Sequence, residues 1–84
     1  MTTETNILYR VNIYFTTGKS LGFIGVDLDS KVCDQLSTDI RNVISCFESR
    51  VSNDVIKISD GHAMYYVNIY EIAYIEVLKR KSNA

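Results

Sequence analysis

The amino-acid sequence predicts a two-layer α+β fold, in which one mainly antiparallel sheet of about five strands packs one face against a single amphipathic helix. Between residues 30 and 49, apolar residues recur at steps of three and four, which is the period of one helical face. On either side of this stretch apolar and polar residues alternate, as they do in strands with one buried face. The expected order of elements is therefore β-β-α-β-β-β, with the helix covering one side of the sheet.

Length and composition indicate one small globular domain. We expect the 84 residues to form a single unit with an ordered core at about 7–79 and frayed ends at 1–5 and 80–84. Hydrophobic residues make up 46% of the chain, and a formal net charge of -1 argues against binding to nucleic acid or acidic membranes by bulk electrostatics. No apolar run approaches the ~20 residues of a membrane span, and the polar start is unlike a signal peptide, so a cytoplasmic protein is expected.

The first two strands are expected at 7–15 and 21–26, joined as a hairpin by the polar link at 16–20. Gly22 and Gly25 fit edge-strand curvature in the second strand, with a bulge or a close approach of another backbone as alternatives. Alternation over 7–15 places two sets of side chains on opposite faces. The face expected to pack on the helix carries Ile7, Tyr9, Val11, Ile13 and Phe15, and the other carries Leu8, Arg10, Asn12 and Tyr14.

The helix is expected from Ser30 to about Ser49, with Asp29 or Ser30 as its N-cap, and is followed by a turn at 52–54. Its apolar stripe comprises Val32, Leu36, Ile40, Val43, Ile44 and Phe47, of which Leu36, Ile40 and Ile44 should lie at the centre of the core. The residues between them, including Ser37 and Asp39, belong to the face expected in water. Four carboxylates gather near the helix start, and we interpret them as caps and solvated surface, with a calcium site as the weaker alternative: Asp27, Asp29, Asp34 and Asp39.

A second hairpin is expected at 55–59 and 62–67, because Asp60-Gly61 between two such runs suits a two-residue type I′ turn. This turn would pair Ser59 with His62, Ile58 with Ala63 and Ile56 with Tyr65. The spacing of Ile69 and Ile72 predicts a one-turn connector at 68–72. The last strand is then expected at 73–79, with Ile75 and Val77 facing the core.

The residue types that usually carry catalysis or bind metal are not assembled, so we expect no enzyme, no cofactor and no metal site. His62 is the single histidine, and its neighbours Ser59 and Asp60 merely share its hairpin, which favours a solvated turn residue. Cys33 and Cys46 would lie roughly 20 Å apart along one helix. We therefore expect free thiols at core or boundary positions, because this separation excludes a disulfide.

The sheet face turned away from the helix is the predicted binding surface, since a single helix covers only one side of a sheet. Tyrosine, arginine and methionine, which are enriched in protein contact surfaces, gather there. The alternative is that tyrosines simply suit strands and expose their hydroxyl groups. The predicted interface residues are Leu8, Arg10, Tyr14, Lys57, Met64, Tyr66, Tyr74 and Leu78.

We predict from this surface a non-catalytic protein–protein interaction module. It would act as a homodimer or higher oligomer, or as an inhibitor of a host protein of the kind that phages and mobile elements encode, the latter by analogy of size alone. The alternative is a small nucleic-acid-binding protein, in which Tyr14, Tyr66 and Tyr74 stack on bases and the basic stretch at 79–81 contacts phosphates. Net charge and Glu76 on the same face weaken that alternative. Neither a membrane nor a metal partner is expected.

Overall fold

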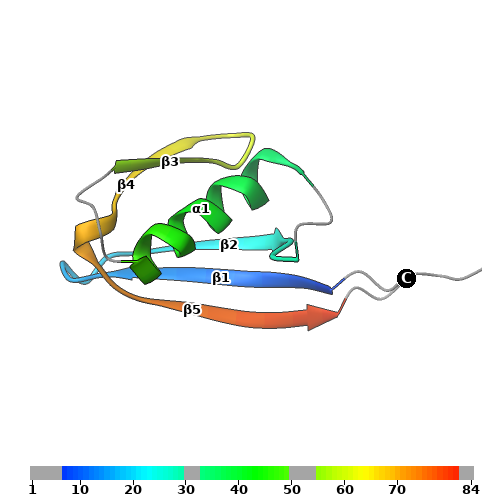
Figure 1. Cartoon of the computed structure of the whole chain (residues 1–84), viewed down its shortest axis with the longest axis horizontal. Helices are drawn as coiled ribbons and strands as arrows, with labels where there is room; N and C mark the ends of the chain where they lie inside the picture. The colour runs from blue at the N-terminus through cyan, green and yellow to red at the C-terminus, as the bar shows by residue number, and fades with distance from the viewer. Residues whose placement is uncertain (1–6, 30–32, 50–54, 82–84) are drawn as a thin grey trace, which may run out of the picture.

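Figure 1 shows the computed structural model of the chain, which describes residues 7–29, 33–49 and 55–81. The predicted α+β fold with about five strands and one helix is confirmed. Its elements are β1 (Ile7–Phe15), β2 (Ser20–Val26), α1 (Gln35–Ser49), β3 (Val55–Ser59), β4 (Met64–Asn68), the 3-10 turn η1 (Ile69–Glu71) and β5 (Ile72–Lys81). Predictions for residues 1–6, 30–32, 50–54 and 82–84, among them the Ser30 cap and the turn at 52–54, lie outside the described residues.

The strands form two sheets where one was predicted. β1 is the central strand of an antiparallel sheet of order β2-β1-β5, whereas β3 pairs with β4 and with no other described strand. The division follows from the predicted connector, where the Asn68 side chain accepts the N–H of Tyr70 (3.0 Å) and caps η1. This short helix redirects the chain, so β5 pairs with β1 and does not continue the sheet beside β4 (Figure 1). The second edges of β2 and β4 are thus left without a strand partner among the described residues.

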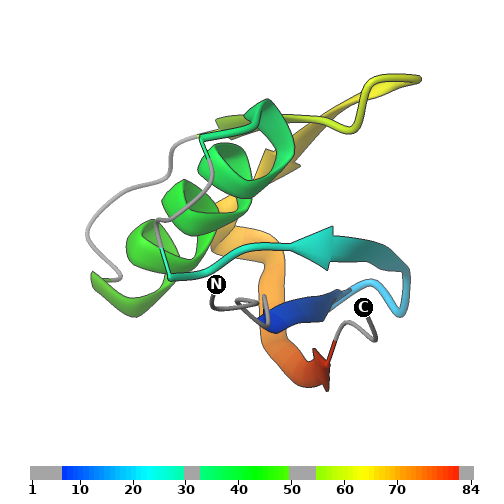
Figure 2. The same ribbon diagram turned by 90° about the vertical axis from the view of Figure 1, so that its right-hand side faces the viewer.

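The helix lies on one side of both sheets, as the side view in Figure 2 shows. It packs chiefly against β3, η1 and β2. The buried apolar core takes residues from every element: Val11, Ile13, Phe23, Val26, Ile40, Val43, Ile58, Val67, Ile69 and Ile72. Val77 is 43% exposed, so its predicted place in the core is wrong, because β5 is the edge strand on the opposite side of β1 from β2, the strand of this sheet on which the helix packs.

The centre of the helix differs from the prediction. Ile40 is fully buried as expected, but Val43 shares the centre with it, and Leu36 and Ile44 are only half-buried. Ser37 and Asp39, predicted to face water, are buried as well. The buried face of the helix is thus rotated from the predicted face toward Ser37 and Asp39. Hydrogen bonds make this rotation possible, because buried polar side chains are tolerated only where partners satisfy them. No buried side-chain nitrogen or oxygen among the described residues lacks a hydrogen-bond partner.

The helix begins at Gln35, five residues later than predicted, and Asp34 is its N-cap. One Asp34 carboxylate oxygen accepts the N–H of Ser37 (2.7 Å) and the other accepts the Ser37 hydroxyl (3.1 Å). The predicted cap at Asp29 is wrong, since Asp29 instead donates its N–H to the Asp27 carboxylate (2.7 Å) in the preceding loop. The Asp27 N–H donates to the Ser37 hydroxyl oxygen (2.9 Å), so Ser37 holds both the loop and the cap.

The loop of the second hairpin is centred one position later than predicted. The N–H of Asp60 donates to the Ala63 carbonyl (3.2 Å), so Asp60 flanks the loop and Gly61 (φ 92°) and His62 form it. The Asp60 carboxylate accepts the N–H groups of both His62 and Ala63, each at 2.8 Å. The pairings are therefore Ser59 with Met64, Ile58 with Tyr65 and Ile56 with Val67. The partners shift by two residues, so each side chain keeps its predicted face.

Candidate binding site

The structure divides the eight predicted interface residues between the two sheets. Five lie on the face of the β2-β1-β5 sheet that points away from α1, which we name the outer face: Leu8, Arg10, Tyr14, Tyr74 and Leu78. The other three lie on the β3-β4 hairpin and are exposed there: Lys57, Met64 and Tyr66. Two separate surfaces therefore take the place of one continuous predicted face.

Side-chain hydrogen bonds connect β1 and β5 across the outer face. The Asn12 amide nitrogen donates to one Glu76 carboxylate oxygen (2.9 Å), and the Tyr14 hydroxyl donates to the same oxygen (3.2 Å). Arg10 in turn donates from Nε to the Asn12 amide oxygen (3.2 Å). Asn12 and Glu76 are directly opposed in the ladder, so the pairing of the strands positions this network. The outer face thus carries an ordered polar cluster, which consists of Arg10, Asn12, Tyr14 and Glu76.

An aromatic pair extends the cluster toward the hairpin end of β1. Tyr14 and Tyr74 are opposed in the ladder, and their rings stack with centroids 4.4 Å apart and planes 21° apart. Such pairs contribute about 0.5–1.5 kcal/mol beyond the area they bury. Tyr74 keeps more than half of its surface exposed while its ring orientation is held by Tyr14. A rigid aromatic side chain in this position loses little entropy when it is covered by a partner.

Gly22 on β2 provides the room for the polar cluster. A Cβ placed there would lie 2.8 Å from the Asn12 amide oxygen and 3.4 Å from an Arg10 guanidinium nitrogen. Side chains, not another backbone, make the close approach at this glycine. Gly25 is different, because it takes φ 71° in the bulge that places both Phe23 and Val26 in the core. A bulge, which was predicted as an alternative to edge-strand curvature, is therefore present at Gly25.

The pKa of Tyr14 is raised above 10.0, first by loss of solvent around the hydroxyl and then by its hydrogen bond to the Glu76 carboxylate and the negative charge there. We predict that Glu76→Gln lowers the Tyr14 pKa, because both Glu76 effects weaken while the desolvation remains. Ring resonances of Tyr14 followed by NMR between pH 8 and 12 would measure the shift, with Tyr70→Phe as a control outside the cluster. A Tyr14 midpoint that does not move in Glu76→Gln would contradict the hydrogen bond.

The raised pKa of Tyr14 also determines the direction in which its contribution to stability changes with pH. A folded-state pKa above the unfolded value means that the Tyr14 contribution is complete below about pH 10 and is lost as the pH rises through the folded pKa. The Asp60 pKa is lowered from 3.8 by the backbone N–H groups of Ala63 and His62, so the opposite sign applies there. Its contribution is present above the unfolded pKa and is lost as the pH falls through the folded one.

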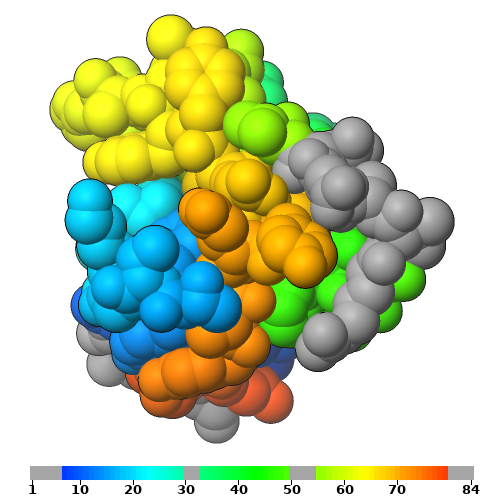
Figure 3. All heavy atoms as spheres, turned by 90° about the vertical axis from the view of Figure 1, so that its left-hand side faces the viewer, coloured from blue at the N-terminus to red at the C-terminus, as the bar shows by residue number. Residues whose placement is uncertain are grey.

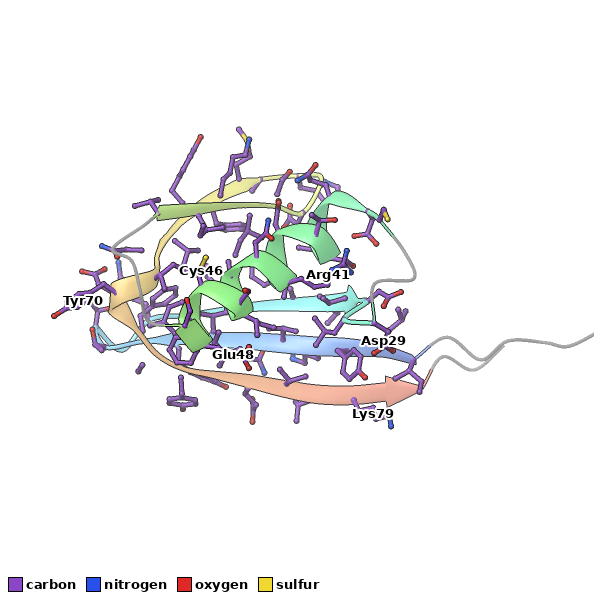
Figure 4. The ribbon with its side chains drawn as sticks, in the orientation of Figure 1. Asp29, Arg41, Cys46, Glu48, Tyr70 and Lys79 are labelled. Atoms are coloured by element: carbon purple, nitrogen blue, oxygen red, sulfur yellow. The ribbon has the colours of Figure 1, made fainter. Side chains whose placement is uncertain are left out.

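Exposed apolar side chains accompany the cluster on the three-stranded sheet. Ile24, Tyr74 and Leu78 are 59%, 56% and 44% exposed, and they come from β2 and β5 on either side of β1. In contrast, Tyr70, at 78% exposure, projects from η1 at the end of the molecule opposite Asp29 and Lys79 (Figure 4). The sequence identified Tyr74 and Leu78 from alternation. Ile24 was missed because no faces were assigned to the glycine-containing second strand, although alternation with the inward-facing Leu21 and Phe23 places Ile24 on the side away from the core.

A groove of ≈ 530 Å³ lies between β4 and the start of β2. Its walls come from the β1–β2 hairpin on one side and from β4 and η1 on the other: Phe15, Thr17, Lys19, Ser20, Leu21, Met64, Tyr65, Tyr66, Val67, Asn68 and Glu71. Figure 3 shows β4 in yellow above the β1–β2 turn in blue to cyan on the same side of the molecule. Inside the molecule, Phe23 and Tyr65 meet edge to face with centroids 5.6 Å apart.

The remaining sequence candidates lie apart from these surfaces. His62 is exposed in its turn, and both thiols are free, with Cys33 exposed and Cys46 half-buried. Within residues 7–29, 33–49 and 55–81, no three His, Cys, Asp or Glu side chains are placed to hold a metal ion. The described helix is not long and apolar enough to cross a membrane.

Comparison of this chain with protein-family models, curated proteins and solved structures found no match.

Proposed function

We propose that the protein is a non-catalytic protein-binding module that uses the outer face for self-association or for binding another protein. The supporting observation is the combination of exposed Ile24, Tyr74 and Leu78 with an ordered cluster on a sheet face that no described element covers. Aromatic and arginine side chains held in place are typical of the energetically important residues of interfaces. Inhibition of a host protein is one form that this binding would take, by analogy of size alone.

Self-association is the form of this proposal that is tested most directly. Among its described side chains, the outer face carries both a cation, Arg10, and an anion, Glu76, so a second copy of the same face can place opposite charges across the interface. A two-fold interface uses the same patch on both chains, which suits a self-complementary face of this kind.

Leu78→Asp is the test substitution, because it places a charge among the exposed apolar residues without touching the core. We expect the mass of the wild-type chain in light scattering to exceed 9.6 kDa at raised concentration and that of Leu78→Asp to remain at the single-chain value. Tyr70→Asp is the matched control, since it also changes an exposed apolar residue, but on η1.

Two outcomes would contradict the proposal. Equal oligomer mass in wild type and Leu78→Asp would exclude the outer face as the self-association surface. A wild-type chain that stays monomeric, together with protein partners that bind Leu78→Asp as well as wild type, would exclude the outer face from protein binding altogether.

A nucleic-acid-binding function is the second candidate, since Tyr74 presents an exposed ring supported by Tyr14 with Arg10 on the same strand face. Bases stack on such rings at about 1–3 kcal/mol each. This function predicts that a fluorescent single-stranded oligonucleotide binds at low salt, that binding falls steeply as salt rises, and that Tyr74→Ala weakens it. Absence of binding at low salt would exclude it.

A further inference from the structure

Two strand edges face the groove, and the hydrogen-bond pattern shows which backbone groups lie on them. The N–H of Phe15 donates to the Lys19 carbonyl (2.9 Å), so Phe15 and every second residue before it direct their backbone groups toward β2. In the register of Ile13 with Leu21 and Val11 with Phe23, β2 uses its odd positions for β1. The N–H and C=O groups of Ser20 and Gly22 therefore lie on the open edge of β2.

The hydrogen bonds of the second hairpin locate the open edge of β4 in the same way. Because Asp60 bonds to Ala63 across the turn, the bonded pairs farther along are Ile58 with Tyr65 and Ile56 with Val67. The backbone groups of Met64, Tyr66 and Asn68 are then directed away from β3. All three residues line the groove, and so does Ser20 of β2. The open edges of β4 and β2 therefore border the same groove.

The side chains around the groove are arranged for an extended segment. Tyr65 and Val67 belong to the inner, apolar side, together with Phe15 and Leu21, which pack against the core. The outer rim carries exposed polar or amphipathic side chains, namely Thr17, Ser20, Met64 and Tyr66. Since successive side chains of a strand alternate between two faces, a segment with alternating apolar and polar residues matches both sides of the groove.

Charge indicates where an acidic residue of that segment would lie. Lys19 directly precedes β2, lines the groove and forms no ion pair with any residue that the structure describes. Glu71 also lines the groove, but it lies on η1, where its backbone carbonyl accepts the N–H of Thr16 (2.9 Å). A carboxylate beside Ser20 would thus have Lys19 as its partner.

We propose that the groove is a strand-addition site for an extended segment of a partner protein, with alternating apolar and polar residues and one acidic side chain that pairs with Lys19. The segment adds its backbone to the open edges of β2 and β4, which supplies affinity through main-chain hydrogen bonds, while alternate side chains enter the apolar side of the groove. This site is separate from the outer face, so the two surfaces are tested independently.

The probe is a displayed library of random ten-residue linear peptides, selected against the full chain. We expect the enriched peptides to share an apolar alternation and an Asp or Glu at one position. Binding of a selected peptide should fall at least tenfold when its backbone nitrogens are methylated at alternate residues, because N-methylation removes the donors that strand addition requires. This comparison uses the wild-type protein and does not depend on the folding of a variant.

Substitutions in the protein test the same site. Ser20→Pro removes an N–H from the open edge of β2, and Lys79→Pro is its matched control on the open edge of β5, at the far side of the same sheet. We expect Ser20→Pro to weaken the peptide at least tenfold and Lys79→Pro to leave it unchanged. Lys19→Glu should reverse the preference, so that the peptide with Lys in place of its acidic residue binds better.

The proposal is overturned if no alternating peptide is enriched, if N-methylated and unmodified peptides bind equally, or if Lys19→Glu leaves the preference for the acidic peptide intact. Leu78→Asp separates this result from the proposed function. A Leu78→Asp chain that loses self-association but still binds the peptide supports both surfaces, whereas peptide binding lost in Leu78→Asp but kept in Ser20→Pro would assign the segment to the outer face.

Discussion

Ile40→Ala is expected to destabilise the protein by about 2–5 kcal/mol, the range seen when a large aliphatic side chain is removed from a packed core. Ile40 is fully buried on α1 beside Val43, and residues from both sheets complete the same core. The free energy of unfolding from urea titration, with the slope checked for constancy, would measure the loss. In a domain this small, such a loss is a large share of the total stability.

Leu36→Ala is the matched control for Ile40→Ala, because it truncates a residue one turn earlier on the same helix that is only half-buried. The sequence placed both residues at the centre of the core. The structure instead predicts a clearly smaller loss of unfolding free energy for Leu36→Ala. Equal losses in the two variants would contradict the rotation of the helix.

Asp39→Ala is the second substitution with a large expected effect, at about 1–3 kcal/mol of unfolding free energy. Asp39 is buried on α1, where one carboxylate oxygen accepts the Gln35 side-chain N–H (2.7 Å) and the other accepts the Ser59 backbone N–H (3.0 Å). Alanine would leave the Ser59 donor at the end of β3 without its acceptor, and an unsatisfied donor costs more than a hydrogen bond contributes.

Two comparisons isolate the role of the Asp39 carboxylate. Asp29→Ala removes an exposed carboxylate and is expected to change stability by less than about 0.5 kcal/mol. Amide hydrogen exchange would report on the Ser59 N–H itself, and we expect faster exchange in Asp39→Ala than in wild type. Unchanged exchange at Ser59 would show that the carboxylate does not hold the end of β3 to the helix.

The existence and type of each element could be predicted because local signals, namely the period of apolar residues and the turn residues between runs, carry this information. The step of three to four residues identified α1, and alternation identified β1, β3 and β5, whose side chains keep their predicted faces. The helix start could not be predicted in the same way, because Asp27, Asp29 and Asp34 are all good caps in isolation. Which one acts was decided by Ser37, which accepts the Asp27 N–H and bonds to Asp34.

The candidate site was predicted in part for a similar reason. Alternation correctly placed Leu8, Arg10 and Tyr14 on one face of β1, and the pairing of β1 with β5 adds Tyr74 and Leu78 to it. Lys57, Met64 and Tyr66 share the same alternation but lie on another sheet. Sequence pattern assigns a side chain to a face of its own strand, and it does not say which strands share a sheet.

By itself, the sequence determined an α+β domain with one amphipathic helix, a strand-rich remainder, and tyrosines on the uncovered sides of its strands, since these follow from local period and composition. Only the tertiary structure decided that the strands divide into two sheets and that the open edges of β2 and β4 border a groove. The physical reason is that strand pairing depends on backbone hydrogen bonds between distant segments. Here a single turn of helix at 69–71 directs β5 to β1 and leaves those edges open.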